Sequence, residues 1–375
     1  MAIDRDRLVR QFVELTAIDS LSLRERTMAD YIIKTFDEMG ISLKEDDSAG
    51  RIGGNAGNLH GIWKGEGEKE AGMLPILFAA HMDTVEPGIG KKAVLHEGGR
   101  ITSDGTTVLG ADDMAAVAVY IEALRSIRDE GKKHRPVEFL FTVAEEMHTR
   151  GSSAFDCSKL ISKEAYVLDC SDVIGSYSAQ EPTLIDFTFV IKGRAAHAGF
   201  EPDKGINAIE IAAKAISRIQ QGWISEGGNL NIGKIEGGIA TNVVSPEVTV
   251  RGELRMEEHE KALETFSQTY EVFREEAERT GGSVDEEHNI KLFAYKIGED
   301  EPALIRYKKI LEDRGITPNV KRSFGGSDNN VLKRNGIRGV CLYNPMHDIH
   351  TTDEYTTVDE LVTMAGIVEE LMCRE

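Results

Sequence analysis

The side chains that could do chemistry stand where four short apolar segments end. These segments span residues 74–80, 137–144, 165–168 and 339–343. The polar side chains directly after them, or in the loop that follows, are His81, Asp83, Glu145, Glu146, Asp169, His347 and His350. A further acidic pair, Asp112 and Asp113, stands at the start of an expected helix at 113–127. Crowded carboxylates repel one another unless a cation neutralises them, so a convergence of these groups predicts a metal site.

Spacing divides the roles among these residues. Residues i and i+2 of an extended segment point the same way, so His81 can bind a metal while Asp83 accepts its other ring N–H. Glu145 and Glu146 are neighbours whose side chains diverge, so one can bind metal and leave the other as a base. Asp112 can bridge two metals through its two oxygens. Nitrogen and oxygen donors without a thiolate suit divalent Zn, Mn or Co.

The four apolar segments are nearly apolar throughout, as in strands covered on both faces of an α/β sheet. Helical spacing of apolar residues between 8 and 36, and again at 113–127, adds helices and a βαβ unit. Open α/β sheets bind ligands beyond the carboxyl ends of their strands, which is where the polar groups fall. The sequence therefore predicts an α/β domain with a mixed, mostly parallel sheet.

A different pattern occupies residues 183–294. Ile185, Phe187, Phe189 and Ile191 alternate with polar residues, which is typical of an antiparallel strand with one wet face. Expected helices at 207–219 and 257–279 complete a small α+β module. We expect one domain at 1–182 and 295–375, interrupted by an inserted domain at 183–294.

Composition narrows the classes of partner. The 375 residues include 44 Lys and Arg against 64 Asp and Glu, a net charge of −20. Nucleic acid and anionic membranes require clustered positive charge, so neither is an expected partner. No apolar stretch is long enough to span a membrane, and the charged start does not read as a signal peptide. Four scattered cysteines fit a reducing compartment, so a cytoplasmic protein is expected.

Several motifs resemble a known family in their order and spacing. They are A-A-H-M-D-T-V at 79–85, L-G-A-D-D-M-A-A at 109–116, A-E-E at 144–146, L-D at 168–169 and H-T-T-D-E-Y at 350–355. This order is similar to that of the two-zinc family of aminoacylase, carboxypeptidase G and peptidase T, and it spans essentially the whole chain. The nearest branch is peptidase T, a tripeptide aminopeptidase, although the loop at 112–116 reads Asp-Asp-Met-Ala-Ala where Asp-Asp-Lys is usual. The resemblance implies a zinc-exopeptidase-like catalytic domain interrupted by a lid and dimerisation domain.

The resemblance also implies a set of site residues. One metal would be held by His81, Asp112 and Asp169, and the other by Asp112, Glu146 and His350. Glu145 would be the general base, with Asp83 assisting, and His347 is the alternative to His350. In the inserted domain, His197 resembles a residue that reaches across a dimer to stabilise the oxyanion. The expected substrate contacts are His197, Asn242, Arg255, Gly326 and Ser327.

The implied function is metal-dependent hydrolysis of peptide bonds in short peptides by an exopeptidase. A hydroxide shared by two divalent ions, most simply zinc, would attack the scissile carbonyl while Glu145 moves the proton. An N-acyl amino acid amidohydrolase or carboxypeptidase of the same family is the alternative, and a metal- or peptide-binding relative without turnover is another. A homodimer formed through the lid domain is expected.

Overall fold

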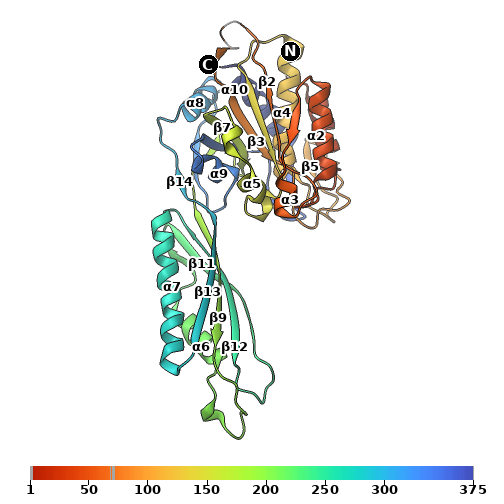
Figure 1. The fold of residues 1–375 in the computed structure, drawn as a ribbon. Coiled ribbons are helices and arrows are strands. Elements are labelled where there is room, and N and C mark those ends of the chain that lie inside the picture. Colours follow the sequence, from red (N-terminus) through yellow and green to blue (C-terminus); the bar gives the residue numbers. More distant parts are fainter. Residues whose placement is uncertain (1–2, 68, 70–71, 375) are drawn as a thin grey trace. The chain divides into compact units, whose positions relative to one another are not determined.

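The structure is a computed structural model that describes residues 3–67, 69 and 72–374. It divides into two units, Met1–Ala179 with Lys296–Glu375, and Gln180–Tyr295 (Figure 1). The expected limits of the inserted domain, 183 and 294, compare with 180 and 295 in this division. The outer limits expected at residues 1 and 375 lie outside the described residues.

The first unit is built on a nine-stranded sheet in the order β1-β2-β6-β3-β7-β16-β8-β14, with β15 paired to β8. The strands are β1 (Leu43–Glu45), β2 (Leu59–Trp63), β3 (Ile76–His81), β6 (Val137–Thr142), β7 (Glu164–Cys170), β8 (Ser176–Glu181), β14 (Tyr295–Lys296), β15 (Asn319–Arg322) and β16 (Arg338–Tyr343). The middle strands β6, β3, β7 and β16 are parallel, whereas β1, β2 and β8 pair antiparallel. The predicted mixed, mostly parallel sheet is confirmed.

Both faces of this sheet are covered, which explains why its central strands are nearly apolar throughout. Phe78 packs in a large core with residues of the first helices, whereas its neighbours Leu77 and Ala79 pack in a second core with Leu332. The helices of this unit are α1 (Arg5–Thr16), α2 (Arg26–Glu38), α3 (Ser48–Ile52), α4 (Ala111–Glu130), α5 (Arg150–Ala154), α8 (Pro302–Asp313), α9 (Asp328–Arg334) and α10 (Val358–Cys373). Parallel strands buried on both faces in this way deliver their carboxyl ends to one edge of the sheet.

Among the described residues, a small sheet and three short 3-10 turns accompany the larger elements. The sheet pairs β4 (Val94–Leu95), β5 (Arg100–Thr102) and β17 (Tyr355–Thr357). The 3-10 turns are Glu145–Met147, Cys157–Lys159 and Pro202–Lys204. The first turn follows β6 directly and carries the predicted base.

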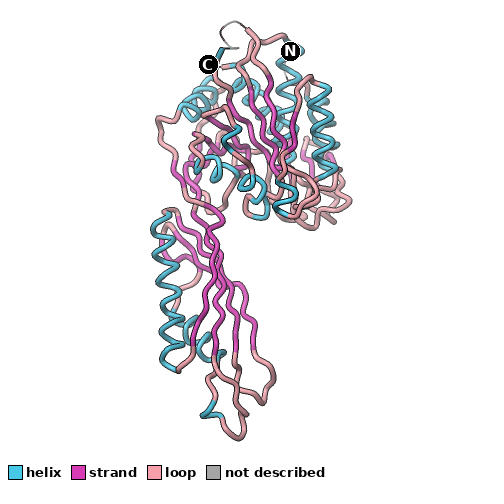
Figure 2. The backbone as a smooth tube through the Cα atoms, in the orientation of Figure 1, coloured by secondary structure: helices cyan, strands magenta, loops and turns pink. Residues whose placement is uncertain are grey.

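The second unit is an antiparallel sheet with two helices (Figure 2). Its strands, in the order β10-β11-β12-β9-β13, are β9 (Thr183–Lys192), β10 (Gly222–Ser225), β11 (Gly228–Gly237), β12 (Glu247–Met256) and β13 (Ser283–Leu292). The helices are α6 (Ala208–Arg218) and α7 (His259–Thr280). Ile185, Phe187, Phe189 and Ile191 are buried in its core, as their alternation predicts. The predicted α+β module is confirmed.

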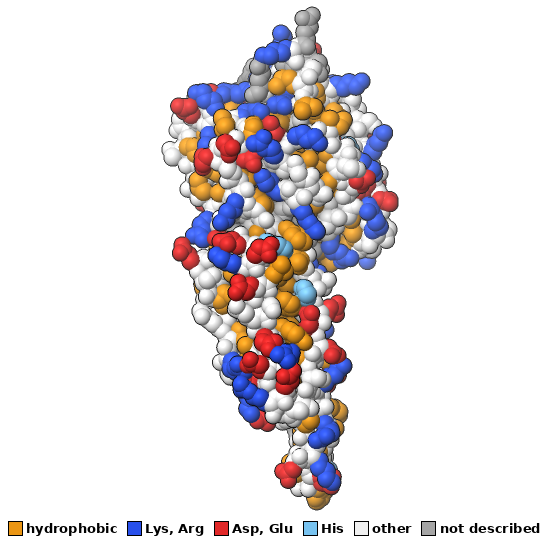
Figure 3. Space-filling model, turned by 60° about the vertical axis from the view of Figure 1, so that its left-hand side comes forward, with side chains coloured by type: hydrophobic (Ala, Val, Ile, Leu, Met, Phe, Trp, Pro, Cys, Tyr) orange, Lys and Arg blue, Asp and Glu red, His pale blue; other side chains and the backbone are white. Residues whose placement is uncertain are grey.

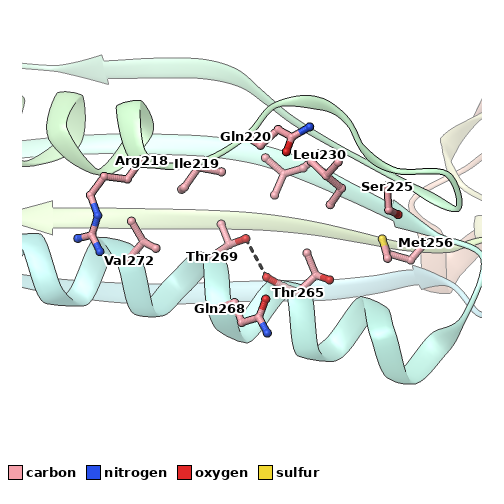
Figure 4. A pocket seen from close by; sticks show the side chains of 11 residues that line it. Arg218, Ile219, Gln220, Ser225, Leu230, Met256, Thr265, Gln268, Thr269 and Val272 are labelled. Carbon is pink, nitrogen blue, oxygen red and sulfur yellow. Dashed lines mark hydrogen bonds between the residues drawn. The ribbon is translucent and has the colours of Figure 1, made fainter.

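The surface shows two further features. On the face drawn in Figure 3, acidic and basic side chains are interspersed. In the second unit, α6, α7 and the neighbouring strands line an open pocket of about 330 Å³, with side chains such as Ile219, Leu230 and Val272 (Figure 4). None of the predicted site residues lines this pocket. Within the described part of the chain, no helix has the length and apolar character to cross a membrane.

Candidate metal centre

Five segments of the first unit carry the predicted metal ligands. His81 ends β3, Asp169 lies near the end of β7, and Glu146 is in the 3-10 turn after β6. Asp112 lies at the start of α4, and its peptide bond to Asp113 is cis. His350 stands in the loop between β16 and β17, with a φ of 63°. Segments far apart in sequence thus meet at the carboxyl edge of the parallel strands.

These residues form two groups that share one carboxylate. The ligand atoms of His81, Asp112 and Asp169 lie within 4.8 Å of one another, and so do those of Asp112, Glu146 and His350. His81 Nε2 is 2.9 Å from Asp112 Oδ1, whereas His350 Nε2 is 3.3 Å from Asp112 Oδ2. The two oxygens of Asp112 therefore face two different imidazoles, as expected of a carboxylate that bridges two cations.

Hydrogen bonds to carboxylates raise the pKa values of both imidazoles of the site. Hydrogen bonds to Asp112 and Glu146 raise the pKa of His350 to about 10, against the opposing effect of burial. Burial by itself lowers the pKa of His81, but its hydrogen bonds to Asp112 and Asp83 raise it well above the ordinary value. Burial by itself raises the pKa of Asp112, but the hydrogen bonds from His350 and His81 hold it below the usual range. Asp112 is therefore the most strongly anionic group of the site.

Burial and mutual repulsion raise the pKa values of three carboxyl groups of the site, those of Asp169, Glu146 and Glu145. Burial, followed by repulsion from Glu145 and Asp112, raises the pKa of Asp169 well above its ordinary value. Burial and repulsion from Asp112 raise the pKa of Glu146, and burial raises that of Glu145. A divalent cation would relieve this repulsion, and the donor set of imidazole nitrogens and carboxylate oxygens suits Zn, Mn or Co. The residues therefore fit two divalent metal ions.

Asp83 lies behind His81, where the sequence places it, and also supports the turn after β6. His81 Nδ1 lies 3.0 Å from the backbone carbonyl of Asp83 and 3.4 Å from its carboxylate. The carboxylate also accepts the backbone N–H groups of Glu145 and Glu146 and the hydroxyl of Ser22. Asp83 thus links β3 to the turn that carries the predicted base.

His347 lies outside both ligand groups. Its Nε2 is 3.0 Å from Glu360 Oε1, and its ring stacks on Tyr355 with 4.6 Å between ring centroids. Its backbone pairs with that of Tyr355 on the far side of the loop. The ring and backbone contacts of His347 therefore hold the loop that presents His350.

Sequence reasoning missed several residues that support the ligands. Asp113 accepts the backbone N–H of His81 and the side-chain amide of Asn344. Glu354 is buried and accepts the N–H groups of Gly110 and Asp112. Asp113 is adjacent to the predicted ligand Asp112, and Glu354 lies within the motif at 350–355, so their positions in the sequence could have identified both. Glu25 and Asn58, which also bond to the turn after β6, had no such signal.

The predicted substrate contacts occupy other places. In the second unit, exposed His197 pairs through its backbone with Val243, next to exposed Asn242. Arg255 Nε is 2.9 Å from Glu253 Oε1. In the first unit, Gly326 precedes α9, and the buried Ser327 caps that helix. The substrate roles of these residues stay predictions.

Comparison with known proteins places the chain in a family. Residues 181–281 match the peptidase dimerisation domain of the M20 family model, and residues 58–214 match peptidase family M28. The solved aminopeptidase PepT of Bacillus cereus is 36% identical, with a TM-score of 0.92 over 99% of this chain and 98% of that one. A tripeptidase of Staphylococcus aureus is 33% identical, with a TM-score of 0.94 over 100% of this chain and 99% of that one.

A curated relative agrees with the two structures. Peptidase T of Brevibacillus brevis is 27% identical over 72% of this chain and 67% of its own length. The M28 match covers under half of this chain, whereas the two solved relatives align over nearly all of it, so they decide the assignment. The chain belongs to the M20 metallopeptidases, in their peptidase T-like branch.

Proposed function

We propose that this protein is a dimetal aminopeptidase that hydrolyses short peptides, with tripeptides as the first substrates to test. The observation that carries the proposal is the pair of ligand groups joined by Asp112. Glu145 lies beside these groups, belongs to neither of them and is only 8% exposed. A carboxyl group that is close to the ligands yet free of them is suited to proton transfer.

Each group would hold one ion, most simply zinc, with manganese or cobalt as alternatives. Divalent ions at such a site lower the pKa of water toward 7 and polarise the scissile carbonyl. His81 and Asp169 would complete one coordination shell, and Glu146 and His350 the other, with Asp112 common to both. Asp83 would orient the ring of His81 through its backbone carbonyl.

Glu145 would move the proton that the reaction requires. Its carboxylate would accept a proton from the attacking water and return it to the nitrogen of the leaving amine. The N–H of Glu145 donates to Asp83 Oδ1 at 2.9 Å, so its backbone is fixed relative to β3. This assignment gives the adjacent glutamates separate roles, with Glu145 as base and Glu146 as ligand.

The named relatives support the choice of substrate class. The two solved relatives are described as an aminopeptidase and a tripeptidase, and each aligns with this chain over nearly its full length. We extend these activities to this chain because the alignments include all five predicted ligand segments. His197, Asn242, Arg255, Gly326 and Ser327 are proposed to contact the substrate, and the protein is proposed to act in the cytoplasm.

We also propose a homodimer formed through the second unit. This unit matches a peptidase dimerisation domain. Of the strands that the structure describes, β10 pairs with the outer edge of β11 near residues 228–230 and none pairs with that edge further along. Ile235 on this stretch is 52% exposed. An open strand edge with an exposed apolar residue is suited to pairing with a second copy.

A substrate panel tests the proposed activity directly. Purified protein would be stripped of metal, reloaded with Zn, Mn or Co, and given free tripeptides, amino-terminally blocked tripeptides and N-acetyl amino acids. We expect metal-dependent release of the first residue from free tripeptides and little turnover of blocked ones. Faster hydrolysis of N-acetyl amino acids would contradict the aminopeptidase assignment and favour the amidohydrolase.

A further inference from the structure

The turn that carries Glu145 and Glu146 is held by side chains from three distant parts of the chain. Four consecutive backbone N–H groups, those of residues 143–146, donate to side-chain oxygens. In order along the chain, the acceptors are Asn58 Oδ1 at 3.1 Å, Glu25 Oε1 at 2.9 Å, Asp83 Oδ1 at 2.9 Å and Asp83 Oδ2 at 3.1 Å. The backbone of this turn is thus fixed by the cradle of Glu25, Asn58 and Asp83.

The turn needs such support because its backbone is neither strand nor α-helix. β6 ends at Thr142, and the 3-10 turn begins at Glu145. Ala144, His148 and Thr149 have φ values of 50°, 61° and 53°, in the left-handed region that residues other than glycine rarely adopt. Such conformations cost about 1–3 kcal/mol each and persist only where surrounding contacts hold them.

Glu25 is the member of the cradle that bonds directly to the strained residue before the base. It is fully buried, and its Oε1 accepts the N–H of Ala144 at 2.9 Å and that of Leu23 at 2.8 Å. Leu23 also has a positive φ, of 68°. One carboxyl oxygen therefore stabilises two left-handed residues, while Oε2 is buried and has no hydrogen-bond partner within the described part of the chain.

The segment around Glu25 is tied to the other end of the site as well. The hydroxyl of Ser22 donates to Asp83 Oδ2 at 2.7 Å, and the N–H of Thr84 donates to the carbonyl of Ser20 at 2.8 Å. Residues 20–25 therefore connect the end of β3 to the turn after β6. A shift of Glu25 would therefore displace the backbone next to Glu145 as well as the loop at 20–25.

We propose that Glu25 is a positioning residue: its Oε1 fixes the backbone of Ala144 and thereby the direction of the Glu145 side chain. The inference rests on the proposed role of Glu145 as base. Glu25 belongs to neither ligand group, so its effect is on geometry and not on metal binding. Burial, with repulsion from Asp83 adding to it, raises the pKa of Glu25 to about 7, which agrees with a side chain that serves as a hydrogen-bond acceptor more than as a charge.

Two substitutions of Glu25 separate acceptor geometry from charge. Glu25→Gln retains an oxygen that can accept both N–H groups, whereas Glu25→Ala removes it. Since a displacement of about 1 Å at a reacting group can lower a rate by about 100-fold, we expect Glu25→Ala to lower kcat by about 10- to 100-fold. KM and the content of two metal ions should be close to native. Glu25→Gln should retain most of the native kcat.

Glu122→Gln is the matched control. Glu122 is also fully buried, but it bonds to Arg7 and to the N–H of Asp4, and neither is a predicted site residue. This variant should lose stability while keeping kcat. Hydrogen exchange of the peptide over 143–149 should accelerate in Glu25→Ala and not in Glu122→Gln.

The outcomes distinguish this inference from the proposed function. If the native protein hydrolyses none of the tested peptides, the proposed function fails, and the exchange measurement still reports on the cradle. If the native protein is active and folded Glu25→Ala has native kcat and native exchange over 143–149, the positioning role is wrong. Should Glu25→Ala fail to fold, Glu25→Asp, which retracts the carboxyl by one methylene, must show the loss of kcat instead, and native kcat in that variant would overturn the inference.

Discussion

Replacing Glu145 by glutamine separates proton transfer from metal binding. Glutamine has nearly the same shape and cannot accept the proton. Glu145 belongs to neither ligand group, and its backbone N–H is held by Asp83, so both metal sites should persist in Glu145→Gln. General acid–base catalysis contributes about 10²- to 10⁴-fold. At about 1.36 kcal/mol for each factor of ten, the loss in transition-state stabilisation should be about 3–5 kcal/mol.

The assay measures kcat and KM on a free tripeptide together with metal content by elemental analysis. The adjacent Glu146→Gln provides the matched comparison, because Glu146 lies 2.9 Å from His350 within the second ligand group. We expect Glu146→Gln to lose metal and to regain part of its activity when metal is added in excess. Glu145→Gln should hold two ions and not respond to added metal. Native turnover in Glu145→Gln, or loss of its metal, would refute the division of roles between the two glutamates.

Three further predictions concern the surroundings of the site. His347→Ala should keep both ions but lower the free energy of unfolding by about 1–2 kcal/mol, measured in urea, because Glu360 loses a half-buried partner. Since the folded-state pKa of Glu25 is raised to about 7 from 4.5, the metal-free protein should lose up to about 3 kcal/mol of stability as the pH rises from 4.5 to 7. Urea titrations across that range should show a flatter profile for Glu25→Gln, and an unchanged profile would contradict the shift. Ile235→Asp should weaken the dimer, and an unchanged mass in light scattering would exclude the open edge of β11 from the interface.

The main features of the fold could be predicted because its hydrophobic patterns are unambiguous. The segment at 137–144 is nearly apolar throughout, and the corresponding strand β6 is buried at every position. The alternation at 185–191 likewise gives one buried face in β9. The start of α4 was harder to predict from the sequence, because Asp112 and Asp113 have non-helical backbone angles within the helix that begins at Ala111.

The convergence of the polar side chains could be predicted because the carboxyl ends of parallel strands meet at one edge, whereas their division into two ligand groups came from the resemblance in motif order. The finer contacts could not be predicted. The position of Asp83 behind His81 follows from the i, i+2 spacing, but nothing in the sequence indicates that its carboxylate also accepts the backbone N–H groups of Glu145 and Glu146. Glu25 lies 120 residues before Glu145 in the sequence. Spacing alone does not indicate that its side chain reaches the backbone of Ala144, in the turn after β6.

Anomalous X-ray scattering from crystals of the metal-loaded protein tests the central claim most directly. We predict two peaks joined by the carboxylate of Asp112, one contacted by His81 and Asp169 and the other by Glu146 and His350. A single ion, a second ion bound by His347, or two ions without Asp112 between them would contradict the proposed centre.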